Sequence, residues 1–307
     1  MLTLSRAIAR KAVAALILGT SAAAAPPLVQ QTASSEGSSN PAKAGSKATL
    51  KPIAATSPDI PFSDFDADSE RQLLELVNQA RTHVGLPALA LDAGLTHAAR
   101  AHAEAMFTAR QLSHQFAGEA SLAERLAAAT HTQLDQEGEN VAFDFDAADA
   151  QENLMLSPPH RANLLNSTFN VIGLGIVRSG NRLYIVQDFG HALPTYSTTE
   201  VKDRIGAAIT RMRHQSGEHG LTQRDLAAAD AVACSMAQAD KISTASVHQL
   251  AQRYSVLSYT TLHPETLPDD ANRALRIRNL RGFSVGACYA RTESYPTGAY
   301  WVVVALD

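Results

Sequence analysis

Residues 157–165 read SPPHRANLL, and residues 138–142 read GENVA. A serine followed by a proline is typical of a helix start, so His160 is expected in the first turn of a helix. Glu139 and His114, which lies in the segment QLSHQF, are the other polar residues of this region suited to chemistry. Imidazole and carboxylate groups bind metals and transfer protons. No HExxH or CxxC spacing joins the three, so they are candidate catalytic or metal-binding residues only as a set.

Apolar residues at helical spacing, each run preceded by a capping residue, predict several helices around these motifs. The predicted helices begin at Ser69, near Asp92 and at Ser121, and a short one covers residues 147–156. Two strand-like runs with Ser-Gly-Asn between them predict an antiparallel hairpin over residues 171–177 and 182–189. Helices followed by a strand pair indicate an α+β domain.

The first 24 residues have a cationic start, a short apolar run and a string of small residues, which is the layout of a secretory signal peptide. The apolar run is shorter than the roughly 20 residues of a membrane helix. The alternative is a buried N-terminal helix. Residues 25–65 are rich in Pro, Ala and Ser and are expected to form a disordered linker. The protein is therefore expected to be secreted, into the periplasm or outside the cell.

Charge and cysteine usage narrow the function further. The net charge of -4 gives no sign of a basic patch, so a nucleic-acid partner is not expected. No segment after the signal peptide is long and apolar enough for a transmembrane span. Cys234 and Cys288 favour one disulfide in an oxidising compartment, and the alternative is two buried thiols.

Several motifs occur in one order: Asn78 and Arg81 in the first helix, a helix followed by His114, the GEN triplet, the Ser-Pro-x-His-Arg-x-Asn run and the closing strands. Together they make residues 66–192 resemble the CAP superfamily (the SCP domain) in its short bacterial, secreted form. The resemblance implies a three-layer α-β-α sandwich. It also implies an open cleft lined by His114, His160 and Glu139.

Some members of that family bind a divalent cation in this cleft, so the resemblance implies zinc or another divalent cation on His114, His160 and Glu139. Larger relatives carry a second acid, whose position is taken here by Ser157. The metal site is thus expected to be weaker, with at most three protein ligands.

Four other polar residues lie close to these motifs. Asn140 and Asn163 are expected to brace the backbone by satisfying loop amides. Gln187 is expected to point either into the cleft or into solvent, and His102 to be structural or solvent-exposed.

Residues 197–307 follow the same order of helix, loop, helix and hairpin. The run LTHAARAHAEAM from Leu95 compares with LAAADAVACSMA from Leu226. No GEN triplet occurs there, and the region matching His160 reads DDANRALRIRNL. We expect a degenerate CAP-like copy that lacks the site residues. The alternative is a C-terminal extension of unrelated fold.

The hypothesis for function is a binding module that holds a small ligand, lipid, protein partner or divalent metal in the His/Glu cleft. The missing second acid favours binding over catalysis. One alternative is a metal-assisted, peptidase-like hydrolase that uses the same cleft. A second is a structural or adhesive extracytoplasmic protein.

Overall fold

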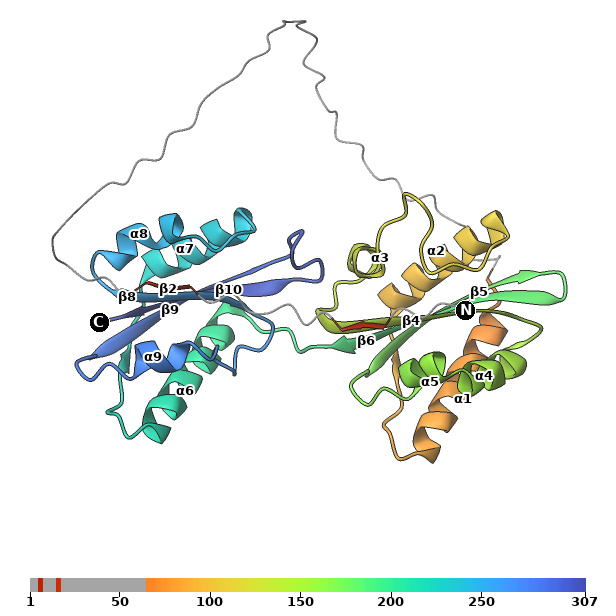
Figure 1. Cartoon of the computed structure of the whole chain (residues 1–307), viewed down its shortest axis with the longest axis horizontal. Helices are drawn as coiled ribbons and strands as arrows, with labels where there is room; N and C mark the ends of the chain where they lie inside the picture. Colours follow the sequence, from red (N-terminus) through yellow and green to blue (C-terminus); the bar gives the residue numbers. More distant parts are fainter. Residues whose placement is uncertain (1–4, 8–14, 18–64) are drawn as a thin grey trace, which may run out of the picture. The chain divides into compact units, whose positions relative to one another are not determined.

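The computed structural model describes residues 5–7, 15–17 and 65–307 (Figure 1). The predicted linker lies outside these residues except for Phe65, and so does most of the predicted signal peptide. Two short strands, β1 (Ser5–Ala7) and β2 (Ala15–Ile17), are the described parts of the first 24 residues. No helix in the described part of the chain is long and apolar enough to cross a membrane.

The first sheet has the strand order β1-β4-β6-β5-β3. Its strands beyond β1 are β3 (Ala90–Leu91), β4 (Leu134–Asp144), β5 (Val171–Ser179) and β6 (Arg182–Ala192). The predicted hairpin is confirmed, because β5 and β6 pair antiparallel around Ser179 and Arg182. The sequence did not predict β4, which carries the GEN triplet. In that strand Glu137, Glu139 and Asn140 are all buried, so the polar and apolar residues do not alternate.

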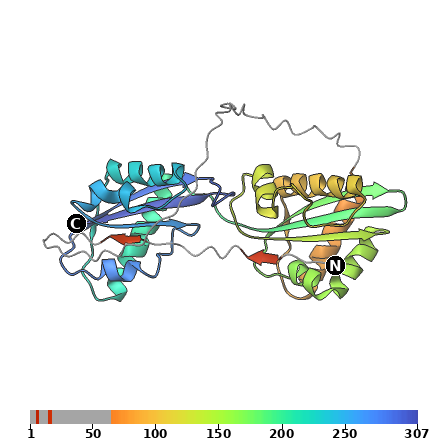
Figure 2. The same ribbon diagram turned by 45° about the horizontal axis from the view of Figure 1, so that its top comes forward.

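Helices cover both faces of this sheet, which gives the three-layer sandwich that the resemblance implies. One layer consists of α1 (Ala67–His83), α4 (Ala147–Leu156) and α5 (Pro158–Leu164). The other consists of α2 (Ala93–Ala109) and α3 (Leu122–Ala129). Figures 1 and 2 show these two groups of helices on opposite sides of the strands. We call residues 65–192 the first domain.

The alanine-rich helix α2 packs its backbone directly on the sheet. A Cβ atom built on Gly173 would lie 2.1 Å from the backbone of Leu95, and one on Gly175 would lie 2.2 Å from that of Ala99. Ala99, Ala103 and Met106 then fill the core on this face. The short side chains of α2 are therefore a requirement of this contact.

The predicted helix starts near Asp92 and at Ser121 are confirmed, and the one at Ser69 is wrong. Ser121 caps α3 in a capping box with Glu124. Helix α1, in contrast, begins at Ala67 with Asp66 as its cap, and the side chain of Asp66 accepts from the Ser69 amide at 3.0 Å. Because the first turn of α1 carries charged residues, the run of apolar residues that predicts the helix begins only after it, and Asp66 was not recognised as the cap.

The second sheet has the order β2-β8-β10-β9-β7, the same arrangement as the first. Its strands beyond β2 are β7 (Thr222–Gln223), β8 (Ser255–Thr261), β9 (Gly282–Ala290) and β10 (Ala299–Leu306). Its helices are α6 (Thr198–Gln215), α7 (Ala227–Gln238), α8 (Thr244–Ala251) and α9 (Ala271–Leu275). Cys234 on α7 and Cys288 on β9 form a disulfide, the pairing that the sequence favoured. We call residues 197–307 the second domain.

A buried arginine occupies the same place in each domain. Arg81 of α1 donates to the carbonyls of Pro87, Leu164, Asn166 and Phe169. Arg213 of α6 donates to the carbonyls of His219, Leu275 and Ile277. Each guanidinium ties a long helix to the loop that follows it and to the end of a short helix. The shared topology and the shared arginine support the predicted duplication, which stays a prediction about ancestry.

Replacing Arg81 by methionine should destabilise the first domain by about 3 kcal/mol or more, because several buried carbonyls would lose their donor. Arg71→Met is the matched control, since the Arg71 side chain is 65% exposed and pairs only with a neighbouring aspartate. Urea unfolding followed by circular dichroism measures both. Equal unfolding midpoints for the two variants would contradict this role of Arg81.

Candidate functional site

His114 lies in the segment between α2 and α3, which turns sharply after α2. Arg110 caps α2 in the left-handed conformation, with φ of 51°. The imidazole of His102, fully buried on α2, contacts this segment through Nε2, 2.8 Å from the Ser113 carbonyl. Since a carbonyl only accepts, Nε2 carries a proton. His102 therefore anchors the segment that carries His114, and solvent exposure is excluded for it.

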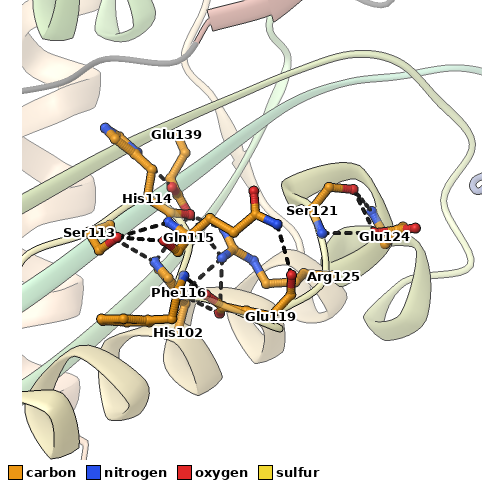
Figure 3. Close-up of polar contacts among 10 residues, drawn as sticks. All are labelled: His102, Ser113, His114, Gln115, Phe116, Glu119, Ser121, Glu124, Arg125 and Glu139. Carbon is orange, nitrogen blue, oxygen red and sulfur yellow. Dashed lines mark hydrogen bonds and ion pairs between the residues drawn. The ribbon is translucent and has the colours of Figure 1, made fainter.

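Glu139 on β4 is buried, and both of its oxygens are paired. Oε1 lies 2.8 Å from Nδ1 of His114, and Oε2 lies 2.5 Å from Nη2 of Arg125 on α3. Figure 3 shows these side chains converging from the segment after α2, from α3 and from β4. The sequence predicted His114 and Glu139, in a set with His160, but not Arg125, because no local motif marks an arginine on an ordinary amphipathic helix.

Arg125 reaches further partners with its other terminal nitrogen. Nη1 lies 3.1 Å from Glu119 Oε1, 3.1 Å from the His114 carbonyl and 2.9 Å from His102 Nδ1. Glu119 Oε1 is in turn 2.7 Å from His102 Nδ1. Arg125, Glu119 and His102 thus form one network beneath the His114 segment (Figure 3).

Asp188 on β6 lies directly opposite Glu139 in the strand register and is also buried. Burial is the main reason that the pKa of Asp188 is raised well above its ordinary value of 3.8, and the charge of Glu139 adds to it. Asp188 therefore keeps its proton to higher pH than an ordinary aspartic acid does. Asp188 was not predicted as a site residue, since QDFG on its own is a strand end.

The two asparagines and Gln187 lie on the opposite face of the sheet. Asn163 donates to the Glu139 carbonyl at 3.1 Å and to Asn140 Oδ1 at 2.9 Å. Asn140 donates to the His160 carbonyl and to Gln187 Oε1. Both asparagines therefore join β4 to α5, but by donating to carbonyls rather than by satisfying loop amides. Gln187 is buried and points into neither cleft nor solvent.

His160 is held by the serine that begins its helix. Ser157 takes the N-cap position of α5 but caps no backbone amide, and its hydroxyl lies 2.8 Å from His160 Nδ1. Burial lowers the pKa of His160 below its ordinary value of 6.5, and the charge of nearby His114 adds to the effect. Ser157, at the position of the missing second acid, thus orients the histidine.

One cavity of about 1120 Å³ brings His114 and His160 together. Glu139 does not line it and supports His114 from behind. The three consecutive residues Val141, Ala142 and Phe143 of β4 all line it. Because successive side chains point to opposite faces of a strand, the cavity reaches around the edge of the sheet to both helical layers.

As arranged, these residues do not fit a divalent cation. Both oxygens of Glu139 already pair with His114 and Arg125, and Nδ1 of His160 contacts a serine hydroxyl. In the described part of the chain, no three or more His, Cys, Asp or Glu side chains are grouped so as to hold a metal ion. Of the predicted set, His114 and Glu139 thus form a hydrogen-bonded pair, and His160 lines the same cavity as His114.

The second domain has apolar residues where this site lies. With the two sheets aligned on their parallel strand pairs, the cross-strand pair of Glu139 and Asp188 corresponds to Val256 and Ala305. In each domain the buried arginine donates to the carbonyl of a leucine, Leu164 or Leu275. His160 and Ala271 lie at the same distance before these leucines, so they correspond. That the second domain is a degenerate copy without site residues stays a prediction.

Residues 74–189 match the family model CAP, the cysteine-rich secretory protein family. This segment is a CAP domain. An uncharacterized membrane protein, YlbC, of Bacillus subtilis (strain 168) is 33% identical over 141 residues, which are 46% of this chain and 39% of that protein. The chain therefore matches about two fifths of that relative's length.

Two solved structures are similar to the CAP domain. An extracellular protein containing a SCP domain from Bacillus anthracis str. Ames is 28% identical, with a TM-score of 0.37 and 41% of each chain covered. An outer surface protein from Borrelia burgdorferi is 19% identical, with a TM-score of 0.39. The match covers 41% of this chain and 94% of that protein.

Asp188→Asn should change how the stability of the protein depends on pH. A carboxyl group whose pKa is raised by folding stays neutral in the native state, so stability is lost as pH rises above the unfolded value. The asparagine variant has no carboxyl group to ionise and therefore lacks this loss. Its free energy of unfolding relative to wild type should therefore rise with pH above about 4, by at most about 1.4 kcal/mol per pH unit.

Urea unfolding at pH 4, 5, 6 and 7 measures this difference. Asp68→Asn serves as the control, because the Asp68 side chain is 88% exposed. A difference between Asp188→Asn and wild type that does not vary with pH would show that Asp188 is ionised in the folded protein.

Proposed function

We propose that the CAP domain is a binding module that holds an amphipathic small molecule in the cavity between His114 and His160. The observation that carries this proposal is the apolar lining at the cavity mouth. Of the eight large hydrophobic side chains that are exposed in the described residues, four line this one cavity: Leu112, Phe143, Phe145 and Leu156. Exposed apolar groups that gather at a concave site are typical of a ligand-binding surface.

The part of the cavity formed by His114, Ser157 and His160 is polar. His114 Nδ1 lies 2.8 Å from the carboxylate of Glu139, which orients the ring. Ser157 and His160 add a hydroxyl and a second imidazole to the lining. This end suits the polar group of an amphipathic ligand.

We further propose that the protein is exported. The signal-peptide pattern of the first 24 residues supports this, and so does the disulfide between Cys234 and Cys288, because disulfides persist in oxidising compartments. The bound ligand would then be a molecule of the periplasm or of the cell exterior.

Phe145→Ala combined with Leu156→Ser should weaken binding of the fluorescent probe 8-anilinonaphthalene-1-sulfonate at least about tenfold, because burial of one such side chain contributes about 1.5–3 kcal/mol. Leu91→Ser is the matched control, since Leu91 is 55% exposed but lies outside the cavity. Fluorescence titration measures all three proteins. An equal loss in Leu91→Ser would show that the probe binds exposed apolar surface in general.

Hydrolysis is separated from binding by a second measurement, on wild type and on a variant without the two histidines. Incubation with a peptide library should release no product above that of a His114→Ala/His160→Ala variant. Cleavage by the wild-type protein alone would favour the hydrolase instead.

A further inference from the structure

The buried cluster beneath His114 has the composition of a cation site. Two carboxylates, Glu119 and Glu139, one imidazole, His102, and the carbonyl of His114 all contact the terminal nitrogens of Arg125. The Glu139 side chain is only 2% exposed and that of Arg125 10%. Oxygen and imidazole donors of this kind are also those that divalent metal ions take.

Arg125 is the group that compensates this cluster. A buried carboxylate is stable only when it is paired with a positive charge. A guanidinium stays protonated in proteins and can bridge several acceptors in fixed directions. The chain thus supplies, from α3, the charge beside Glu139 that a metal ion would otherwise supply.

We propose that Arg125 is the resident cation of this site, so that the His114–Glu139 pair is assembled without a metal. Arg125 acts as a positioning residue in two ways. Its Nη1 binds the backbone carbonyl of His114, and its Nη2 binds Glu139, which in turn holds the ring of His114. One side chain therefore fixes both the backbone and the imidazole of the histidine that lines the cavity.

Wild type and the variant Arg125→Ala are expected to differ in zinc binding. In wild type Arg125 already pairs with both carboxylates, so zinc should not displace it. In Arg125→Ala the carboxylates of Glu119 and Glu139 lose their counter-charge beside His102 and His114. That variant should bind Zn²⁺ at this place, and wild type should not.

Calorimetric titration of the full chain with zinc chloride, with spectra of ¹⁵N-labelled histidine, tests both statements. We expect Arg125→Ala to bind one equivalent of zinc at least tenfold more tightly than wild type, with shifts of the His102 and His114 signals. Adding Glu139→Gln to this variant should remove the gain. Arg100→Ala is the matched control, because it removes another largely buried guanidinium, which pairs with Glu70 at 2.6 Å. Among the residues that the structure describes, no histidine contacts Glu70.

Two results would overturn the proposal. One is that equimolar zinc shifts the His114 signals of wild type. The other is that a folded Arg125→Ala variant gains no more zinc affinity than Arg100→Ala. If Arg125→Ala does not fold, Arg125→Lys replaces it, because one ammonium cannot bridge Glu139, Glu119 and the carbonyl together. His114 signals in Arg125→Lys that equal those of wild type would then overturn the positioning role. The proposal stands or falls independently of ligand binding in the cavity, because no measurement uses a cavity ligand.

Discussion

The carboxylate of Glu139 is buried in the middle of β4, and the arrangement of the site follows from the need to compensate that charge. Arg125 pairs with one oxygen and His114 with the other. Burial, and next to it the adjacent Glu139, raise the pKa of the neighbouring Asp188 well above its ordinary value. The segment after α2 is in turn fixed, since His102 and Arg125 both bind its carbonyls. A single buried charge thus orders groups from three separate elements around one wall of the cavity.

The second domain shows that the topology does not require this charge. Its strands pair in the same order, and Arg213 takes the place of Arg81, yet Val256 and Ala305 stand where Glu139 and Asp188 lie. An apolar cross-strand pair fills the position without a desolvation penalty, whereas buried ion pairs contribute little net stability. The polar cluster of the first domain is therefore better explained by what it does for the cavity than by folding.

Local signals in the sequence predicted the parts of the fold that depend on neighbours along the chain. The capping box at Ser121, the start of α5 at Ser157 and the β5–β6 hairpin are of this kind. Strand β4 was missed because helices cover both of its faces, which removes alternation. Arg125 and Asp188 were missed because their roles depend on contacts across the sheet and between layers. The family motifs supplied His114, Glu139 and His160, but only the structure shows that a guanidinium occupies the second oxygen of Glu139.

The two histidines reach the cavity from different layers of the sandwich. His160 begins α5 on one face of the sheet, while His114 follows α2 on the other, and the cavity meets both where it passes around β4. Asn140 and Asn163 hold α5 to this strand on the first face, as Glu139 holds His114 on the second. The consecutive residues Glu139 and Asn140 of β4 contact His114 on one face and the His160 backbone on the other. The strand therefore sets the separation of the two histidines. A ligand bound between them would therefore meet polar groups whose positions are fixed before it arrives, which favours recognition by a preformed site.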